Sequence, residues 1–177
     1  MRISRRLGLA SALPILALAV FAPFSGASRA GGPCTGAMLT GTFKAVPNSE
    51  GAGNIVYRLR LVDSSSQPCF VTGIPGLTLL TASGKKLPTN ARFGGRPGAL
   101  SAVMVPLTTG HAAALTARFS PDVPGPGEPV LKNACERTAY KLRVAPSGGG
   151  TVVVPIKPPT PVCEHGTLSL TVFTRAS

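Results

Sequence analysis

Cysteine and histidine side chains are the groups in this 177-residue sequence whose types and spacing could do chemistry. Cys163 and His165 stand two positions apart, so on a strand they would share one face, as a Cys/His catalytic pair requires. Both histidines, His111 and His165, stand beside a glycine in segments typical of turns. A zinc site would need close pairs such as CxxC, whereas the nearest two cysteines are 28 positions apart. The spacing therefore predicts no metal site.

The first 30 residues have the layout of a secretory signal peptide. Three arginines among the first six residues precede an apolar stretch from Leu7 to Phe24, and Ser28 and Ala30 fit the small-residue cleavage rule. An uncleaved anchor is the alternative, but no basic stop-transfer cluster follows the apolar stretch. We predict cleavage after residue 30 and one mature domain over residues 31–177.

Two details of export are open. Arg5 and Arg6 resemble a twin-arginine signal, although Gly8 stands where an apolar residue is usual, and general secretion is favoured. A lipid anchor on Cys34 would need a small residue directly before it, and Pro33 occupies that position. We expect an extracellular or cell-wall protein without a lipid anchor, in contact with a membrane only during export.

An even number of cysteines in an exported chain is typical of a disulfide framework. The four are Cys34, Cys69, Cys135 and Cys163. Three pairings are possible, and we favour Cys34 with Cys69 and Cys135 with Cys163, because each bond then joins segments one or two strands apart. An oxidising compartment would also consume a free nucleophilic thiol.

Sequence motifs of common enzymes are missing. Neither GxSxG nor HExxH occurs, and the lysines after Gly84 lack the serine or threonine of a phosphate-binding loop. The acidic residues are scattered through predicted loops and strand ends: Glu50, Asp63, Asp122, Glu128, Glu136 and Glu164. We predict no catalytic residues, no cofactor and no metal.

The predicted mature chain is basic. Four of the 18 lysines and arginines lie in the first 30 residues, so 14 remain against six acidic residues, a net charge of +8. These charges stand singly except at Lys85 and Lys86, and the chain has no tryptophan and two tyrosines, which disfavours nucleic acid as a partner. The loop Gly94–Gly98, with Arg92 and Arg96, is the segment that could meet an anionic partner.

Apolar residues alternate with polar ones, which predicts strands. The clearest case is NIVYRLRLVD, in which the odd-numbered residues from Ile55 to Leu61 face one way and Arg58 and Arg60 the other. AYKLRVA, residues 139–145, has the same pattern, with Tyr140 predicted to face inward beside Leu142. Other predicted strands cover 37–46, 77–81, 100–107, 113–119, 151–156 and 167–173, with short pieces near Phe70 and Leu87.

About eight short strands predict an all-β fold, a two-layer antiparallel β-sandwich of the immunoglobulin-like kind. Gly84 suits a hairpin turn that needs a positive φ. The proline-rich segment 121–130 is predicted to be a long exposed connection, and residues 131–137 a short helix.

These landmarks resemble a known family. The shared segments here are DSSSQPCFVTGIPGL, LTLLTASGKKL, VPLTTGHAAALTA, NACERTAYKLRV and PVCEHGTLSL. The characteristic residues are Pro68, Cys69, Gly73, Pro75, Gly76, Gly84, Leu107, Gly110 and Ala112. The sequence resembles an actinobacterial exported family known as domain of unknown function number four-two-three-two. The resemblance extends from Cys34 to Phe173, implies export and the sandwich fold, and implies no catalytic residue.

Together these observations predict a secreted or cell-envelope, non-catalytic domain that binds an unidentified protein, a glycan or an anionic cell-wall polymer. The binding residues are not identified by the sequence. The alternative is a small secreted hydrolase or a protease inhibitor, for which segment 121–130 is the one candidate inhibitory loop.

Overall fold

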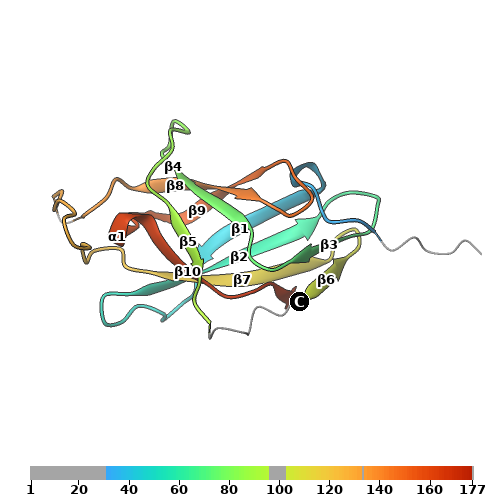
Figure 1. Ribbon diagram of the computed structural model, residues 1–177, viewed down its shortest axis with the longest axis horizontal. Coiled ribbons are helices and arrows are strands. Elements are labelled where there is room, and N and C mark those ends of the chain that lie inside the picture. The colour runs from blue at the N-terminus through green and yellow to red at the C-terminus, as the bar shows by residue number, and fades with distance from the viewer. Residues whose placement is uncertain (1–30, 96–102, 133, 177) are drawn as a thin grey trace, which may run out of the picture.

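Strands account for nearly all of the regular structure. The computed structural model describes residues 31–95, 103–132 and 134–176, so the predicted signal peptide lies outside the described residues (Figure 1). Within these ranges the strands are β1 (Leu39–Ala45), β2 (Ile55–Asp63), β3 (Cys69–Thr72), β4 (Gly76–Leu80), β5 (Asn90–Phe93), β6 (Met104–Leu107), β7 (Ala112–Phe119), β8 (Ala139–Ala145), β9 (Val152–Thr160), β10 (Thr167–Leu170) and β11 (Thr174–Ala176). Two single-turn helical segments, η1 (Gly36–Met38) and α1 (Cys163–Gly166), complete the described elements.

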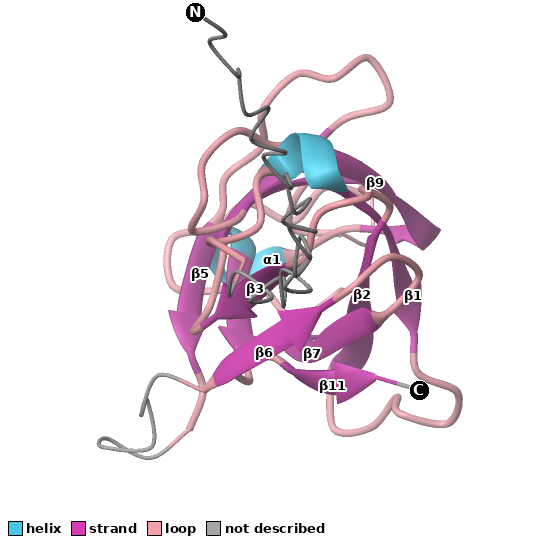
Figure 2. Ribbon diagram, turned by 90° about the vertical axis from the view of Figure 1, so that its right-hand side faces the viewer, coloured by secondary structure: helices cyan, strands magenta, loops and turns pink. Residues whose placement is uncertain are grey.

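Strand pairing confirms the predicted sandwich, with eleven strands in the described residues instead of about eight. The order β4-β8-β9-β1-β2-β7-β10-β5 divides into a layer β4-β8-β9 and a layer β1-β2-β7-β10-β5. β1 joins them, because it is antiparallel to β2 along its whole length and parallel to β9 at Phe43 and Lys44. Figure 2 looks along the long axis of Figure 1 and shows the strands surrounding the interior. β3 pairs with β6, and β11 with β7.

The predicted alternation in β2 is confirmed. Tyr57, Leu59 and Leu61 are fully buried, whereas Arg58 is exposed. Inward side chains of β8 and β9, such as Leu142 and Ile156, belong to the same apolar cluster. Burial of apolar surface contributes about 25 cal/mol per Å², so this shared core is the main force that holds the layers together.

Several predicted details were wrong. The first concerns β8, where Ala139 is fully buried and Tyr140 is 43% exposed. An irregularity in the pairing with β9 between Ala139 and Lys141 breaks the alternation and turns Tyr140 outward. Leu142 faces inward as predicted.

The second and third concern segment boundaries. Residues 131–137 contain an isolated β-bridge between Leu131 and Ala134 in place of the predicted helix. The predicted strand 167–173 ends at Leu170, and a separate strand that was not predicted, β11, pairs with β7 from Thr174. Part of the predicted strand 100–107 lies outside the described residues.

Both predicted disulfide bonds are present. Cys34 is bonded to Cys69 with a Cα–Cα distance of 4.9 Å, and Cys135 to Cys163 with a distance of 5.4 Å. The first bond ties the segment before η1 to β3, and the second ties the connection before β8 to α1. The Cys163 thiol is thus consumed, which removes the nucleophile from the candidate Cys/His pair.

The backbone at α1 is a turn, as predicted around His165, so Cys163 and His165 do not share a strand face. Glu164 and His165 both have a φ of +55°, in the left-handed region, and Gly166 follows with +73°. Each such non-glycine residue costs roughly 1–2 kcal/mol. A Cβ at Gly166 would lie 2.0 Å from the Pro88 carbonyl oxygen, so glycine is required there. The turn therefore needs interactions that hold it.

A carboxylate of the proline-rich connection holds this turn. The connection is mostly exposed, as predicted, but Glu128 is only 9% exposed. Its Oε2 accepts hydrogen bonds from the Gly125 and Glu164 amides and its Oε1 from the His165 amide, each at 2.8 Å. Burial opposes ionisation, yet these three backbone donors outweigh it and lower the pKa of Glu128. Burial, and then the Glu128 charge, raise the pKa of the Glu136 carboxyl nearby.

We expect the double substitution C34S/C69S to lower the free energy of unfolding by about 3–4 kcal/mol, because the bond closes a loop of 35 residues in the unfolded chain. Urea denaturation of the secreted chain, followed by circular dichroism, measures this loss. C135S/C163S should behave similarly, since its loop spans 28 residues. A loss below about 1 kcal/mol in both variants would contradict the staple role.

We expect Glu128→Gln to lower the Tm by about 5 °C at pH 7. The pKa of Glu128 is lower in the folded than in the unfolded chain, so its ionised form contributes stability above the unfolded pKa, about 4.3. That contribution disappears as the pH falls through the lower folded pKa, and thermal unfolding at pH 7 and pH 3 measures the difference.

Glu50→Gln is the matched control for this experiment, because Glu50 is an exposed glutamate in the connection between β1 and β2. It should leave the Tm unchanged at both pH values. Removing the Glu128 charge also removes its repulsion of the Glu136 carboxylate, which is a stabilising effect. The decrease in Tm measured for Glu128→Gln is therefore a lower bound on the contribution of the Glu128 carboxylate. An equal decrease at pH 7 and pH 3 would exclude the carboxylate as the cause.

Candidate functional site

Cross-strand register gathers basic side chains on the outer surface of one layer. We call this surface the basic face and define it by Lys44, Arg58, Arg60, Arg92 and Arg118. Lys44 lies directly opposite Arg58 in the pairing of β1 with β2. Further across the layer, Ser169 of β10 lies opposite Arg118 of β7 on one side and opposite Arg92 of β5 on the other. Residues directly opposite each other point to the same side of a sheet, so these side chains share one face.

Acidic side chains do not balance this charge. The described strands β1, β2, β5, β7, β10 and β11 contain one acidic residue, Asp63, and its side chain is fully buried. Asp63 Oδ1 accepts hydrogen bonds from the backbone N–H and the hydroxyl of Ser65 at the end of β2. Like charges directly opposite, such as Lys44 and Arg58, destabilise a sheet. A bound anion would remove that repulsion.

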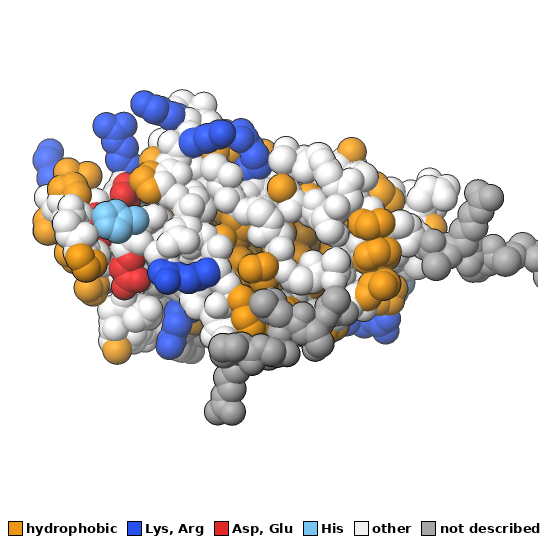
Figure 3. All heavy atoms as spheres, viewed as in Figure 1, with side chains coloured by type: hydrophobic (Ala, Val, Ile, Leu, Met, Phe, Trp, Pro, Cys, Tyr) orange, Lys and Arg blue, Asp and Glu red, His pale blue; other side chains and the backbone are white. Residues whose placement is uncertain are grey.

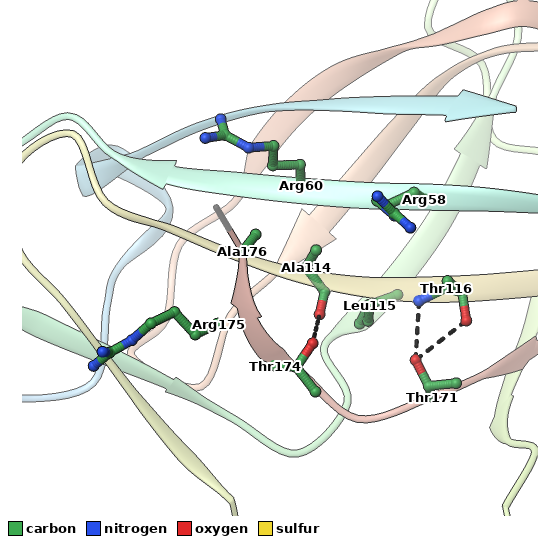
Figure 4. A pocket seen from close by; sticks show the side chains of 9 residues that line it. All are labelled: Arg58, Arg60, Ala114, Leu115, Thr116, Thr171, Thr174, Arg175 and Ala176. Carbon is green, nitrogen blue, oxygen red and sulfur yellow. Dashed lines mark hydrogen bonds between the residues drawn. The ribbon is translucent and has the colours of Figure 1, made fainter. Parts of the chain in front are cut away.

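A pocket of about 280 Å³ adjoins the basic face (Figure 4). Arg58 and Arg60 of β2 lie on one side, Thr116 lies on β7, and Thr171 and Thr174 lie on the far side of β7. The C-terminal segment forms this second wall and is hydrogen-bonded to β7. The Thr116 amide donates to Thr171 Oγ1 at 2.9 Å, and Thr174 Oγ1 donates to a β7 carbonyl at 3.3 Å. The pocket therefore combines two cations with hydroxyl groups.

Arg175 also lines this pocket, but Figure 4 shows its guanidinium pointing away from Arg58 and Arg60. We therefore leave Arg175 out of the basic face. The outward position of Arg58 and Arg60 could be predicted from the alternation in β2. The threonines were missed, because no local pattern shows that residues 171 and 174 return to β7.

A second pocket, of about 310 Å³, lies at the α1 end between Arg92, Glu164 and His165. Arg92 donates to the Thr167 hydroxyl at 3.1 Å, and His165 Nε2 lies 3.1 Å from the Pro126 carbonyl oxygen. Figure 3 shows acidic side chains, a histidine and basic side chains gathered at this end. Cations and anions are mixed here, so this pocket favours no single charge.

The two histidines cannot act in one site. His111 directly precedes β7, and His165 lies in α1, whose Cys163 amide donates to the Ser120 carbonyl just after β7. β7 has eight residues, which at about 3.3 Å each separate its ends by roughly 26 Å. His111 Nδ1 is paired with the Thr108 hydroxyl at 2.6 Å.

The predicted anion loop is only partly described. Arg92 lies at the end of β5 and belongs to the basic face, while Arg96 and Gly98 lie outside the described residues. Among residues 31–95, 103–132 and 134–176, no cluster of three or more histidine, cysteine or acidic side chains is arranged to hold a metal ion. No helix in these ranges has the length and apolar character needed to cross a membrane.

Comparison with known proteins places the chain at the level of a family. A search of curated proteins found no match, and a search of solved structures found none either. A family model described as Domain of unknown function (DUF4232) matches residues 34–174. This match covers both disulfide bonds and the strands from β1 to the first residue of β11. The chain therefore belongs to the DUF4232 family of domains.

Proposed function

We propose that this chain is an exported, non-catalytic binding domain whose basic face holds an anionic ligand of the cell envelope, such as an acidic glycan or polymer. One observation carries the proposal. Five basic side chains share one face of a sheet whose strands contain a single, buried acidic residue. The pocket beside Arg58 and Arg60 gives this charge a defined place for an anionic group.

The sheet is a rigid support for these cations. Arg58 and Arg60 are two residues apart on a central strand, so their Cα atoms are separated by about 7 Å. A guanidinium can form two parallel hydrogen bonds with a carboxylate or phosphate, and little entropy is lost when the supporting backbone is already fixed. These features favour an anionic ligand over a neutral glycan.

Support for a location outside the cytoplasm comes from the disulfide bonds and from the N-terminal sequence. Two disulfide bonds are typical of proteins that mature in an oxidising compartment. The N-terminal sequence has the signal-peptide layout described above. In that setting, the net positive charge would attract anionic polymers over about one Debye length, some 8–10 Å at ordinary salt.

We expect R58A/R60A to weaken binding of the mature chain to polyphosphate and to polyglutamate by about tenfold or more, because two charge-assisted contacts are lost. Isothermal titration calorimetry at low salt and at 0.5 M NaCl measures the affinity and its salt dependence. The variant should also show a smaller salt dependence than the parent chain.

The matched control is K141A/R143A, which removes two positive charges from the outer surface of β8 in the other layer. It should retain most of the affinity. If both double variants lose the same affinity, net charge and not the basic face determines binding, and the proposal fails.

A further inference from the structure

The pocket beside the basic face continues into a groove of about 470 Å³ with a different character. The two depressions share Thr116 and Thr171, so they adjoin on the outer surface of β7 and β10. Val56, Phe93 and Val172 contribute apolar surface to the groove. We call it the apolar groove and define it by these three residues and the two shared threonines.

The junction is built from hydrogen-bonded threonines. Thr171 Oγ1 accepts from the Thr116 amide at 2.9 Å and lies 3.3 Å from the Thr116 hydroxyl. The Thr171 amide in turn donates to the Thr116 carbonyl at 3.0 Å. These contacts fix the C-terminal segment against β7 at the point where the charged pocket meets the apolar groove. The boundary between the two is thus part of the folded framework.

The charged pocket and the apolar groove lie next to each other on this surface. Arg58 and Arg60 lie at one end, and Arg118 stands on the wall of the apolar groove, directly opposite Val56. Val56, Phe93 and Val172 are each only half-buried, so a ligand could remove further apolar surface from water. A fully hydrophilic polymer would satisfy the arginines and leave this apolar surface exposed.

We propose that the ligand is an anionic amphiphile, a single apolar chain with a phosphate or carboxylate head. The head binds Arg58 and Arg60 beside the threonine hydroxyls, and the chain lies in the apolar groove over Val56 and Val172. This inference rests on the proposed function, because the head group uses the basic face. It specifies the chemical class of ligand that the domain holds.

The test uses the secreted, oxidised chain and the probes inorganic phosphate, butyl phosphate, hexyl phosphate and octyl phosphate, each below its micelle concentration. Amide chemical shifts followed by NMR measure weak and tight binding on the same sample. We expect the affinity to rise about fourfold for each methylene that enters the groove. Octyl glucoside, with the same chain and a neutral head, should bind at least about tenfold more weakly than octyl phosphate.

Two variants test the apolar groove and the arginines separately. V56T/V172T keeps the side-chain shape but places a hydroxyl in the groove, and it should weaken octyl phosphate about tenfold while leaving inorganic phosphate unchanged. V153T is its control, since Val153 is a 49% exposed valine on β9 in the other layer. R58A/R60A should weaken both octyl phosphate and inorganic phosphate.

Each contrary outcome has one meaning. An affinity that does not rise with chain length, or that V56T/V172T does not change, overturns the amphiphile and leaves the anion-binding function intact. Equal affinity for octyl glucoside and octyl phosphate also overturns it, because the head would then make no contribution. Phosphate binding that R58A/R60A does not change overturns the proposed function itself.

Discussion

The pairing of β1 with strands of both layers is the constraint on which the rest of the structure depends. Phe43 lies opposite Leu59 on the antiparallel side and opposite Ile156 on the parallel side, and its side chain is fully buried. Its ring is 5.0 Å from the ring of Tyr57, which contacts the Phe119 ring at 5.2 Å. β1 thereby sets the register of β2, and β2 that of β7. A slip of one residue would turn Arg58 and Arg60 into the core.

The ends of the sandwich are held by different means. Cys34–Cys69 fastens the start of the domain to β3, and at the other end Cys135–Cys163 and the Glu128 carboxylate hold α1. The left-handed backbone at Glu164 and His165 is costly, and it persists because three amides of this region share one buried carboxylate. Arg58 and Arg60 lie on the sheet between these ends and therefore do not depend on strained loops, whereas Arg92 lines the pocket at the α1 end.

Loops at the ends of a sandwich are the usual binding surfaces. In this domain the strongest candidate is instead the surface of a sheet, where strand register places cations and threonines in rows. Such a surface changes little when a ligand binds, since each strand is fixed by its neighbours. The pocket beside Arg58 and Arg60 and the apolar groove, which Arg118 also lines, together form one continuous surface.

Local pattern determined the all-β fold, the presence of disulfide bonds, the turn at Gly84 and the outward direction of Arg58, because alternation, cysteine content and positive-φ turns can be read from the sequence alone. Long-range pairing decided the remainder. Tyr140 faces outward because of an irregularity opposite β9, and Thr171 meets Thr116, 55 residues away, only because the C-terminal segment returns to β7. Which strands become neighbours depends on how the whole core packs, so the composition of the site was decided by the tertiary structure.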